Sequence, residues 1–101
     1  MIDDIRAKIV RGRFEFSKHP VDQTIIRGVT VDEIRQAISA GEIIEDYPDD
    51  KYGASCLVFG QTESGRALHV QCSHPSREVI KIITVYEPDP DLWLDFKRRV
   101  K

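Results

Sequence analysis

The chain has 101 residues, of which 41% are hydrophobic and 32% charged, so one soluble globular domain over residues 1–101 is expected. No apolar run approaches the roughly 20 residues of a membrane span. The acidic N-terminus lacks the features of a signal peptide, so we expect a cytoplasmic protein that does not bind a membrane. The net charge of -2 is unusual for a general nucleic-acid binder, because such domains are usually basic.

Helical spacing governs the first part of the chain. Isoleucines at helical intervals predict a first helix over residues 4–11, and the alternation over residues 13–17 predicts a short strand at a sheet edge. A second helix is predicted to begin at Pro20 and to end at Gly28, because proline suits the first helical position and glycine the end of a helix.

A third helix is predicted over residues 31–40 from signals at both of its ends. Thr30 and Glu33 have the spacing of a capping box, in which a hydroxyl and a carboxylate satisfy two backbone N–H groups reciprocally. Gly41 is predicted to end the helix. The apolar stripe between these ends predicts that one side of the helix packs on a core.

Strand-like patterns follow, at residues 42–47, 55–60, 67–72 and 79–86. The residues 63–65 fit a three-residue hairpin loop, with glycine in its left-handed position. This loop sets the pairing of the two strands that it joins. The predicted pairs are Cys56 with Cys72, Val58 with Val70 and Gly60 with Leu68 on a face toward the helices, and Phe59 with His69 and Leu57 with Gln71 on a face that is only partly covered.

The apolar segment 79–86 predicts a strand that is buried on both faces and central in the sheet. Asp89-Pro90-Asp91 after it predicts the start of a final helix, with basic residues at its C-terminal end. The fold class is therefore α+β, with helices packed on one face of an antiparallel β-meander sheet and the order α-β-α-α-β-β-β-β-α.

Metal and thiol chemistry have little support in the sequence. Cys72, His74 and Cys56 do not complete a tetrahedral ligand set, so no metal and no cofactor are expected. A disulfide between the two cysteines is geometrically conceivable if the predicted register holds, although a reducing cytosol disfavours it. As a nucleophile, a cysteine buried in the core would be inert.

Several segments together resemble the bacterial family called domain of unknown function 4258. The matching segments are Phe16-Ser17-Lys18-His19, Arg27-Gly28-Val29-Thr30, Gly41 to Glu45 with Tyr47-Pro48, Leu68-His69-Val70, and Ile83 to Asp89 followed by Trp93. The resemblance implies a RelE-like fold, related to the RelE-like and MqsR-like toxins that cleave messenger RNA, and a YgiT-type zinc-finger antitoxin as a partner. One departure is Pro20, where the family usually has alanine; the following turn is also less basic than is usual.

Metal-independent RNA cleavage needs a base, an acid and cations for the phosphorane. The residues predicted to supply acid and base are His69, Tyr86 and His19, and those predicted to bind RNA are Arg27, Arg66 and Arg77. Four of these residues also have an ordinary structural interpretation, and that of Tyr86 is a hydrogen bond to a loop. A strand histidine often packs beside an aromatic ring, His19 could cap a helix, and Arg27 could stabilise a helix end.

Two other functions remain open. The chain could be a non-catalytic protein–protein interaction module, because it lacks a decisive catalytic triad and has a predicted edge strand that could accept another strand. It could also be a degenerate toxin fold that binds the zinc-finger partner and has lost its site. Messenger RNA would be a ligand only under the ribonuclease hypothesis, and no direct binding of DNA is expected.

Overall fold

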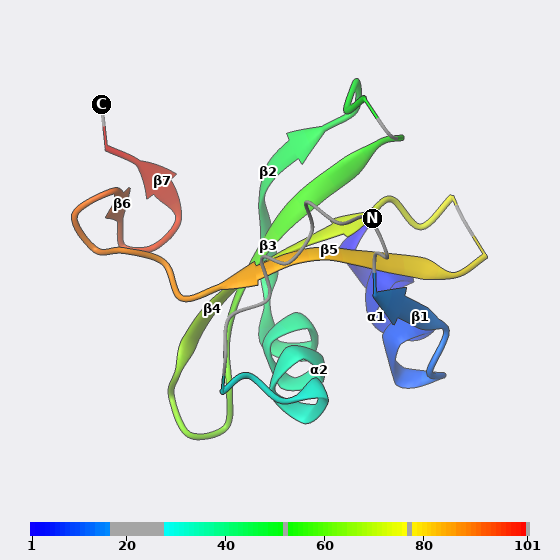
Figure 1. Cartoon of the computed structure of the whole chain (residues 1–101), viewed down its shortest axis with the longest axis horizontal. Helices are drawn as coiled ribbons and strands as arrows, with labels where there is room; N and C mark the ends of the chain where they lie inside the picture. Colours follow the sequence, from blue (N-terminus) through cyan, green and yellow to red (C-terminus); the bar gives the residue numbers. More distant parts are fainter. Residues whose placement is uncertain (17–27, 52, 77, 101) are drawn as a thin grey trace.

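The computed structural model describes residues 1–16, 28–51, 53–76 and 78–100. A twisted five-stranded sheet has helices on one face, and a small two-stranded hairpin lies at the C-terminal end of the chain (Figure 1). The elements are α1 (Ile2–Val10), β1 (Phe14–Phe16), α2 (Val31–Ala40), β2 (Glu42–Tyr47), β3 (Ser55–Gln61), β4 (Ala67–Ser73), β5 (Ile80–Tyr86), β6 (Trp93–Leu94) and β7 (Arg98–Arg99). None of the helices in these residues is long and apolar enough to cross a membrane.

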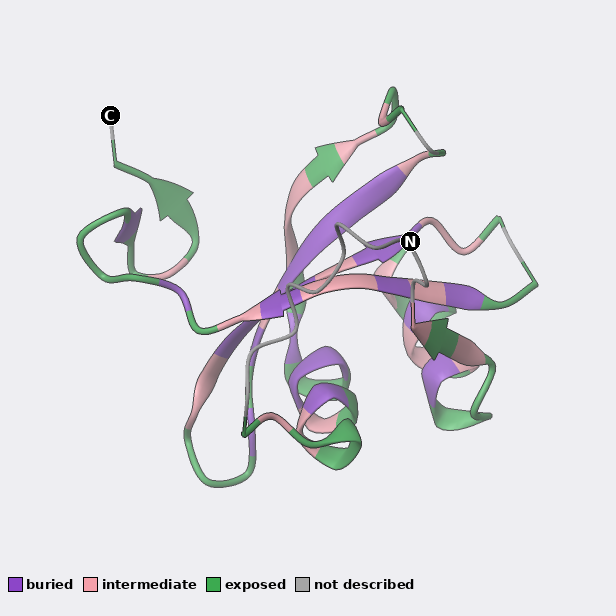
Figure 2. Cartoon of the chain, viewed as in Figure 1, coloured by how far each residue is buried: buried purple, intermediate pink, exposed green. Residues whose placement is uncertain are grey.

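The hydrophobic core lies between the sheet and the two helices. Alternate side chains of β3 and β4, together with the buried side chains of β5, meet the inner stripes of α1 and α2, and Figure 2 shows burial concentrated on these elements. The fully buried members of this cluster are Ile5, Ile9, Ile34, Ile38, Cys56, Val58, Val70, Cys72, Ile80, Ile82 and Val85. The prediction that helices cover one face of the sheet is confirmed.

Helix α2 begins and ends where the sequence predicts. The Thr30 hydroxyl accepts a hydrogen bond from the Glu33 N–H at 3.1 Å, and the Glu33 carboxylate accepts one from the Thr30 N–H at 3.0 Å. Gly41 follows the last helical residue, but its φ of -91° is not left-handed. Glycine is instead required by close packing, because a Cβ atom at this position would lie only 2.5 Å from the Ala37 carbonyl oxygen.

The strand meander is confirmed with its predicted register. The pairing places Cys56 opposite Cys72 and Phe59 opposite His69, and Gly65 in the connecting loop has a φ of +86°. The predicted antiparallel arrangement is wrong at one edge, where β1 pairs with β5 in parallel. A parallel pair needs a long crossover connection, and the meander and α2 between residues 16 and 80 supply it.

The strand at 79–86 is interior but is not the middle of the sheet. The strand order is β1-β5-β4-β3-β2, so β4 is the middle strand. Only one face of β5 is fully buried, because Ile80, Ile82 and Val85 are buried while their neighbours are partly exposed. The predicted second helix, which would begin at Pro20, lies outside the described residues.

The predicted final helix is wrong, because the chain forms the β6–β7 hairpin instead. The Asp89 side chain and carbonyl accept hydrogen bonds from the N–H groups of Asp91 and Leu92, so the capping residues close a turn rather than open a helix. The hairpin turns through Asp95 and Phe96, whose φ angles of 53° and 61° are left-handed. Burial of an aromatic side chain from this segment outweighs a weak helix preference.

Candidate functional site

The sheet face opposite the helices carries the polar and aromatic side chains of the meander. Alternation along each strand places His69, Phe59 and Tyr86 on this face, because their neighbours in the register point into the core. His69 and Tyr86 are direct partners on β4 and β5. The sequence left open whether these two side chains share a face, and the structure brings them together.

His69 is completely buried and both of its ring nitrogens are bonded. Nε2 lies 2.6 Å from the carbonyl oxygen of Phe96, and Nδ1 lies 3.0 Å from the Tyr86 hydroxyl. A carbonyl can only accept, so Nε2 donates its hydrogen and Nδ1 accepts one from Tyr86. Burial favours the neutral imidazole, and in that form its single hydrogen is on Nε2.

Aromatic rings enclose the His69 imidazole. Its centroid lies 4.5 Å from that of Trp93, 5.2 Å from that of Tyr86 and 5.9 Å from that of Phe59, all with edge-to-face geometry. Burial lowers the pKa of His69 below its ordinary value of 6.5. The prediction that this face is only partly covered is therefore wrong at His69, because the β6–β7 hairpin covers it.

A charge network beside the histidine holds the hairpin on the sheet. Arg99 donates to both carboxylate oxygens of Glu45 at 2.8 and 3.1 Å, and its guanidinium lies 4.7 Å from the Trp93 ring centroid. Tyr47 donates a short hydrogen bond to Glu45. The bond from Arg99 lowers the pKa of Glu45, and burial with the bond to Glu45 raises the pKa of Tyr47 to about 12.

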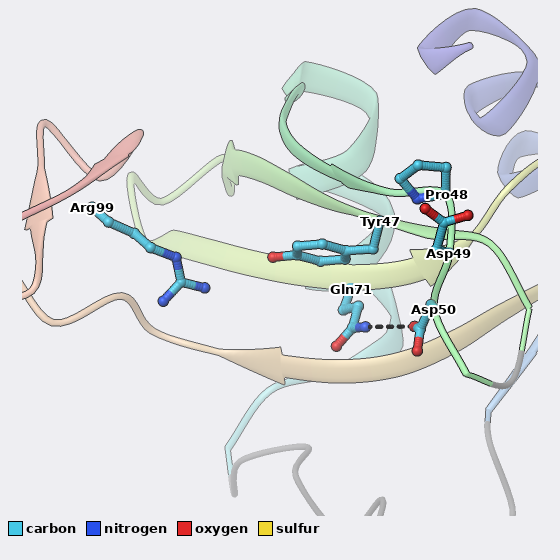
Figure 3. A pocket seen from close by; sticks show the side chains of 6 residues that line it. All are labelled: Tyr47, Pro48, Asp49, Asp50, Gln71 and Arg99. Carbon is cyan, nitrogen blue, oxygen red and sulfur yellow. Dashed lines mark hydrogen bonds between the residues drawn. The ribbon is translucent and has the colours of Figure 1, made fainter.

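This network extends into an open groove of about 520 Å³ along the same face (Figure 3). Arg99 lies at one end and Asp50 at the other, with Tyr47 and Gln71 between them. Asp50 accepts hydrogen bonds from Ser55 at 2.6 Å and from Gln71 at 3.4 Å. Because the cation is already neutralised by Glu45 and the far end is acidic, the groove is a poor binding site for phosphate.

Arg66, the remaining predicted residue that the structure describes, does not join this site. Arg66 donates to Glu33 at 3.2 Å, to Glu87 at 2.9 Å and to the Gly28 carbonyl at 2.8 Å, and its pKa is raised, chiefly by the bond to Glu87. Arg66 therefore ties the loop after β3 to the start of α2 and the exit of β5. His19, Arg27 and Arg77 lie outside the described residues.

Several residues of the network were missed by the sequence interpretation. Glu45 and Tyr47 are two apart on one strand, so alternation alone could have placed them on one face. Arg99 could not be found, because the segment was assigned to a helix. Within the described ranges, no three His, Cys, Asp or Glu side chains are grouped so as to hold a metal ion.

The buried histidine predicts a loss of stability in mild acid. Because the pKa of His69 is lowered in the folded chain, the unfolded chain binds a proton first as the pH falls below about 6.5, and acid favours unfolding. Above that pH, His69 is neutral in both the folded and the unfolded chain, and its contribution to the free energy of unfolding is complete. Neighbouring Glu45 raises this pKa and Arg99 lowers it, so their effects oppose each other.

Urea unfolding at about pH 7.5 and about pH 5.5 tests this expectation. The free energy of unfolding should fall more between these values in the wild type than in a His69→Gln variant, which keeps a donor and an acceptor but does not titrate. An equal fall in the two proteins would contradict it.

Comparison with known proteins identifies the family. The family model described as Domain of unknown function (DUF4258) matches residues 16–87, which include β2 to β5 and both His69 and Tyr86. No curated protein and no solved structure matches the chain. The matched region covers well over half of the sequence, and the chain therefore belongs to the DUF4258 family.

Proposed function

We propose that this chain is a non-catalytic protein-binding module with a toxin-like, RelE-related fold, and that its partner is a YgiT-type zinc-finger protein. The observation that carries the proposal is an exposed apolar surface on the outer side of the β6–β7 hairpin. Exposed apolar patches rimmed by polar groups are typical of protein interaction sites.

The pairing of the hairpin defines its two sides. Trp93 pairs with Arg99, and its ring contacts both the Arg99 guanidinium and the His69 imidazole. This side of the hairpin therefore faces the sheet. The residues of the other parity therefore point outward. They are Leu92, Leu94, Arg98 and Val100, called the outer hairpin face below; its three apolar members are 61%, 51% and 45% exposed.

The charge on this face favours a partner with carboxylates. Lys97 and Arg99 pair with Glu42 at 3.3 Å and Glu45 at 2.8 Å, so the cations nearest the sheet are neutralised within the chain. Arg98 is the charged member of the outer hairpin face and is exposed. A complementary partner surface is apolar and carries an acidic side chain opposite Arg98.

The contacts of the candidate catalytic residues His69 and Arg66 favour a protein-binding function over catalysis. A general base must reach the proton that it removes, and His69 is fully enclosed with both nitrogens bonded. Arg66 is likewise committed to Glu33 and Glu87. Among the described residues of the predicted site, His69 and Arg66 are therefore held in structural roles.

Affinity measurements with a purified YgiT-type zinc-finger protein test the proposal. Leu94→Asp should weaken binding by about 30-fold or more, the factor that corresponds to a central interface residue worth about 2 kcal/mol. Val10→Asp is the matched control, because Val10 is 74% exposed on α1 and lies outside the outer hairpin face. Equal effects of the two variants, or tight binding by Leu94→Asp, would refute the assignment of this face.

A metal-independent endoribonuclease is the second candidate function. One observation favours it, the 3.0 Å approach of His69 and Tyr86, which would form an acid–base pair if the hairpin left the sheet. We expect no cleavage when the purified chain is incubated with messenger RNA in a chelator. Cleavage by the wild type that is lost in a folded His69→Gln variant would favour this candidate instead.

A further inference from the structure

Cys56 and Cys72 form a cross-strand pair in the core. Their place in the ladder follows from the bonds at its two ends, where His74 N donates to Ala54 O at 3.0 Å and Thr62 N donates to Arg66 O at 2.9 Å. Hydrogen-bonded pairs recur at every second residue of an antiparallel ladder, so the cysteines occupy a hydrogen-bonded pair. Such pairs have Cα atoms about 5.5 Å apart, near the commonest spacing in disulfides.

The two thiol groups are in contact in the core. The two Sγ atoms lie 4.0 Å apart, and both residues are fully buried. A disulfide requires a separation of about 2.05 Å, so the two sulfur atoms have to approach each other by about 2 Å through side-chain rotation and a small shift of the two strands. The hydrogen bond from Cys72 lowers the pKa of Cys56 and raises that of Cys72, so Cys56 is the better nucleophile.

We infer that Cys56 and Cys72 are a thiol modification site that a low-molecular-weight disulfide oxidises to an intramolecular disulfide between β3 and β4. The Cys56 thiolate attacks one sulfur of the small disulfide, forms a mixed disulfide and releases one small thiol. Cys72 then attacks the Cys56 sulfur and releases the second small thiol. In total, the two protein thiols lose two electrons and two protons, and the small disulfide takes up both to become two thiols.

A reagent can reach the pair only when the core opens transiently, because both thiols lie on the face covered by the helices, and edge strand β2 borders this part of the core. Cys56 pairs on its other side with Asp46 of β2, and β2 ends the sheet. Partial separation of an edge strand costs less than global unfolding. Oxidation is therefore expected to be slow, and the product to be protected from small reductants once the strand closes again.

Incubation of the full chain with oxidised glutathione tests this inference. Intact-mass measurement should show the loss of two hydrogens without a glutathione adduct, and peptide mapping should join Cys56 to Cys72. The melting temperature should rise by about 5 °C or more and return after reduction, because the crosslink restricts the unfolded chain. Cys72→Ser is the matched control, which can only form a mixed disulfide.

The contrary outcomes are distinct. A stable glutathione adduct on the wild type, or a dimer linked between chains, would show that the two sulfurs cannot meet. No reaction in the folded chain over several days, while the urea-unfolded chain reacts, would show that the core does not open to the reagent. Any of these three results would overturn the inference without affecting the proposed partner binding.

Discussion

Replacement of Gly60 by alanine is expected to reduce the stability of this protein by about 3 kcal/mol or more. A Cβ atom at this position would lie 1.8 Å from the Ala37 carbonyl oxygen and 2.5 Å from its carbonyl carbon. The obstruction is helix backbone, which cannot rotate aside as a side chain can. Helix α2 would have to move off β3, and the core between them would open.

Urea unfolding of Gly60→Ala and Gly65→Ala separates this clash from the general cost of replacing glycine. Gly65 has a φ of +86° and nothing within 4 Å of an added Cβ, so its replacement should cost only about 1 kcal/mol from backbone strain. Similar losses in both variants would mean that β3 and α2 are not packed as closely as the structure shows.

Replacement of His69 by alanine is expected to cost about 3 kcal/mol and to loosen the C-terminal hairpin. The change leaves a cavity among aromatic rings and removes the partner of two half-buried polar groups, the Tyr86 hydroxyl and the Phe96 carbonyl. Trp93 is the single tryptophan of the chain and contacts the histidine ring, so its fluorescence reports on the hairpin directly.

The emission of Trp93 should shift to longer wavelength in His69→Ala as the indole meets water. Tyr86→Phe is the matched control, because it removes one hydrogen bond and leaves the rings in place; it should cost about 1 kcal/mol with little spectral change. An unchanged tryptophan spectrum in His69→Ala would show that the histidine does not hold the hairpin. This result would also remove the main objection to its availability for catalysis.

Local signals predicted the fold well where both ends of an element were specified. The capping box fixed the start of α2, and the three-residue loop fixed the register of β3 and β4, because each depends on residues within a few positions. The parallel edge and the final hairpin depend on partners far away in sequence. Capping and helical periodicity are local signals. They cannot show that the segment around Trp93 is more stable as a hairpin, in which the indole packs on His69, than as a helix.

The candidate site was predicted in part for the same reason. Alternation placed His69 and its partner Phe59 on one face, but the turn before β5 left open whether Tyr86 shares that face, which only the structure shows. The degree of burial could not be predicted, because the covering residues come from a segment with the wrong assigned structure. The predicted contact of Arg66 with RNA remains a hypothesis; the structure gives this side chain two carboxylate partners.

The parallel pairing of β1 with β5 bears on how the chain folds. Every other neighbouring pair in the main sheet joins consecutive strands, whereas Phe14 pairs with Ile80 across most of the sequence. Contacts of such high sequence separation cost the most loop-closure entropy and are intrinsically slow to form. The meander can therefore assemble first, and docking of the N-terminal helix and strand becomes the late step that completes the native state.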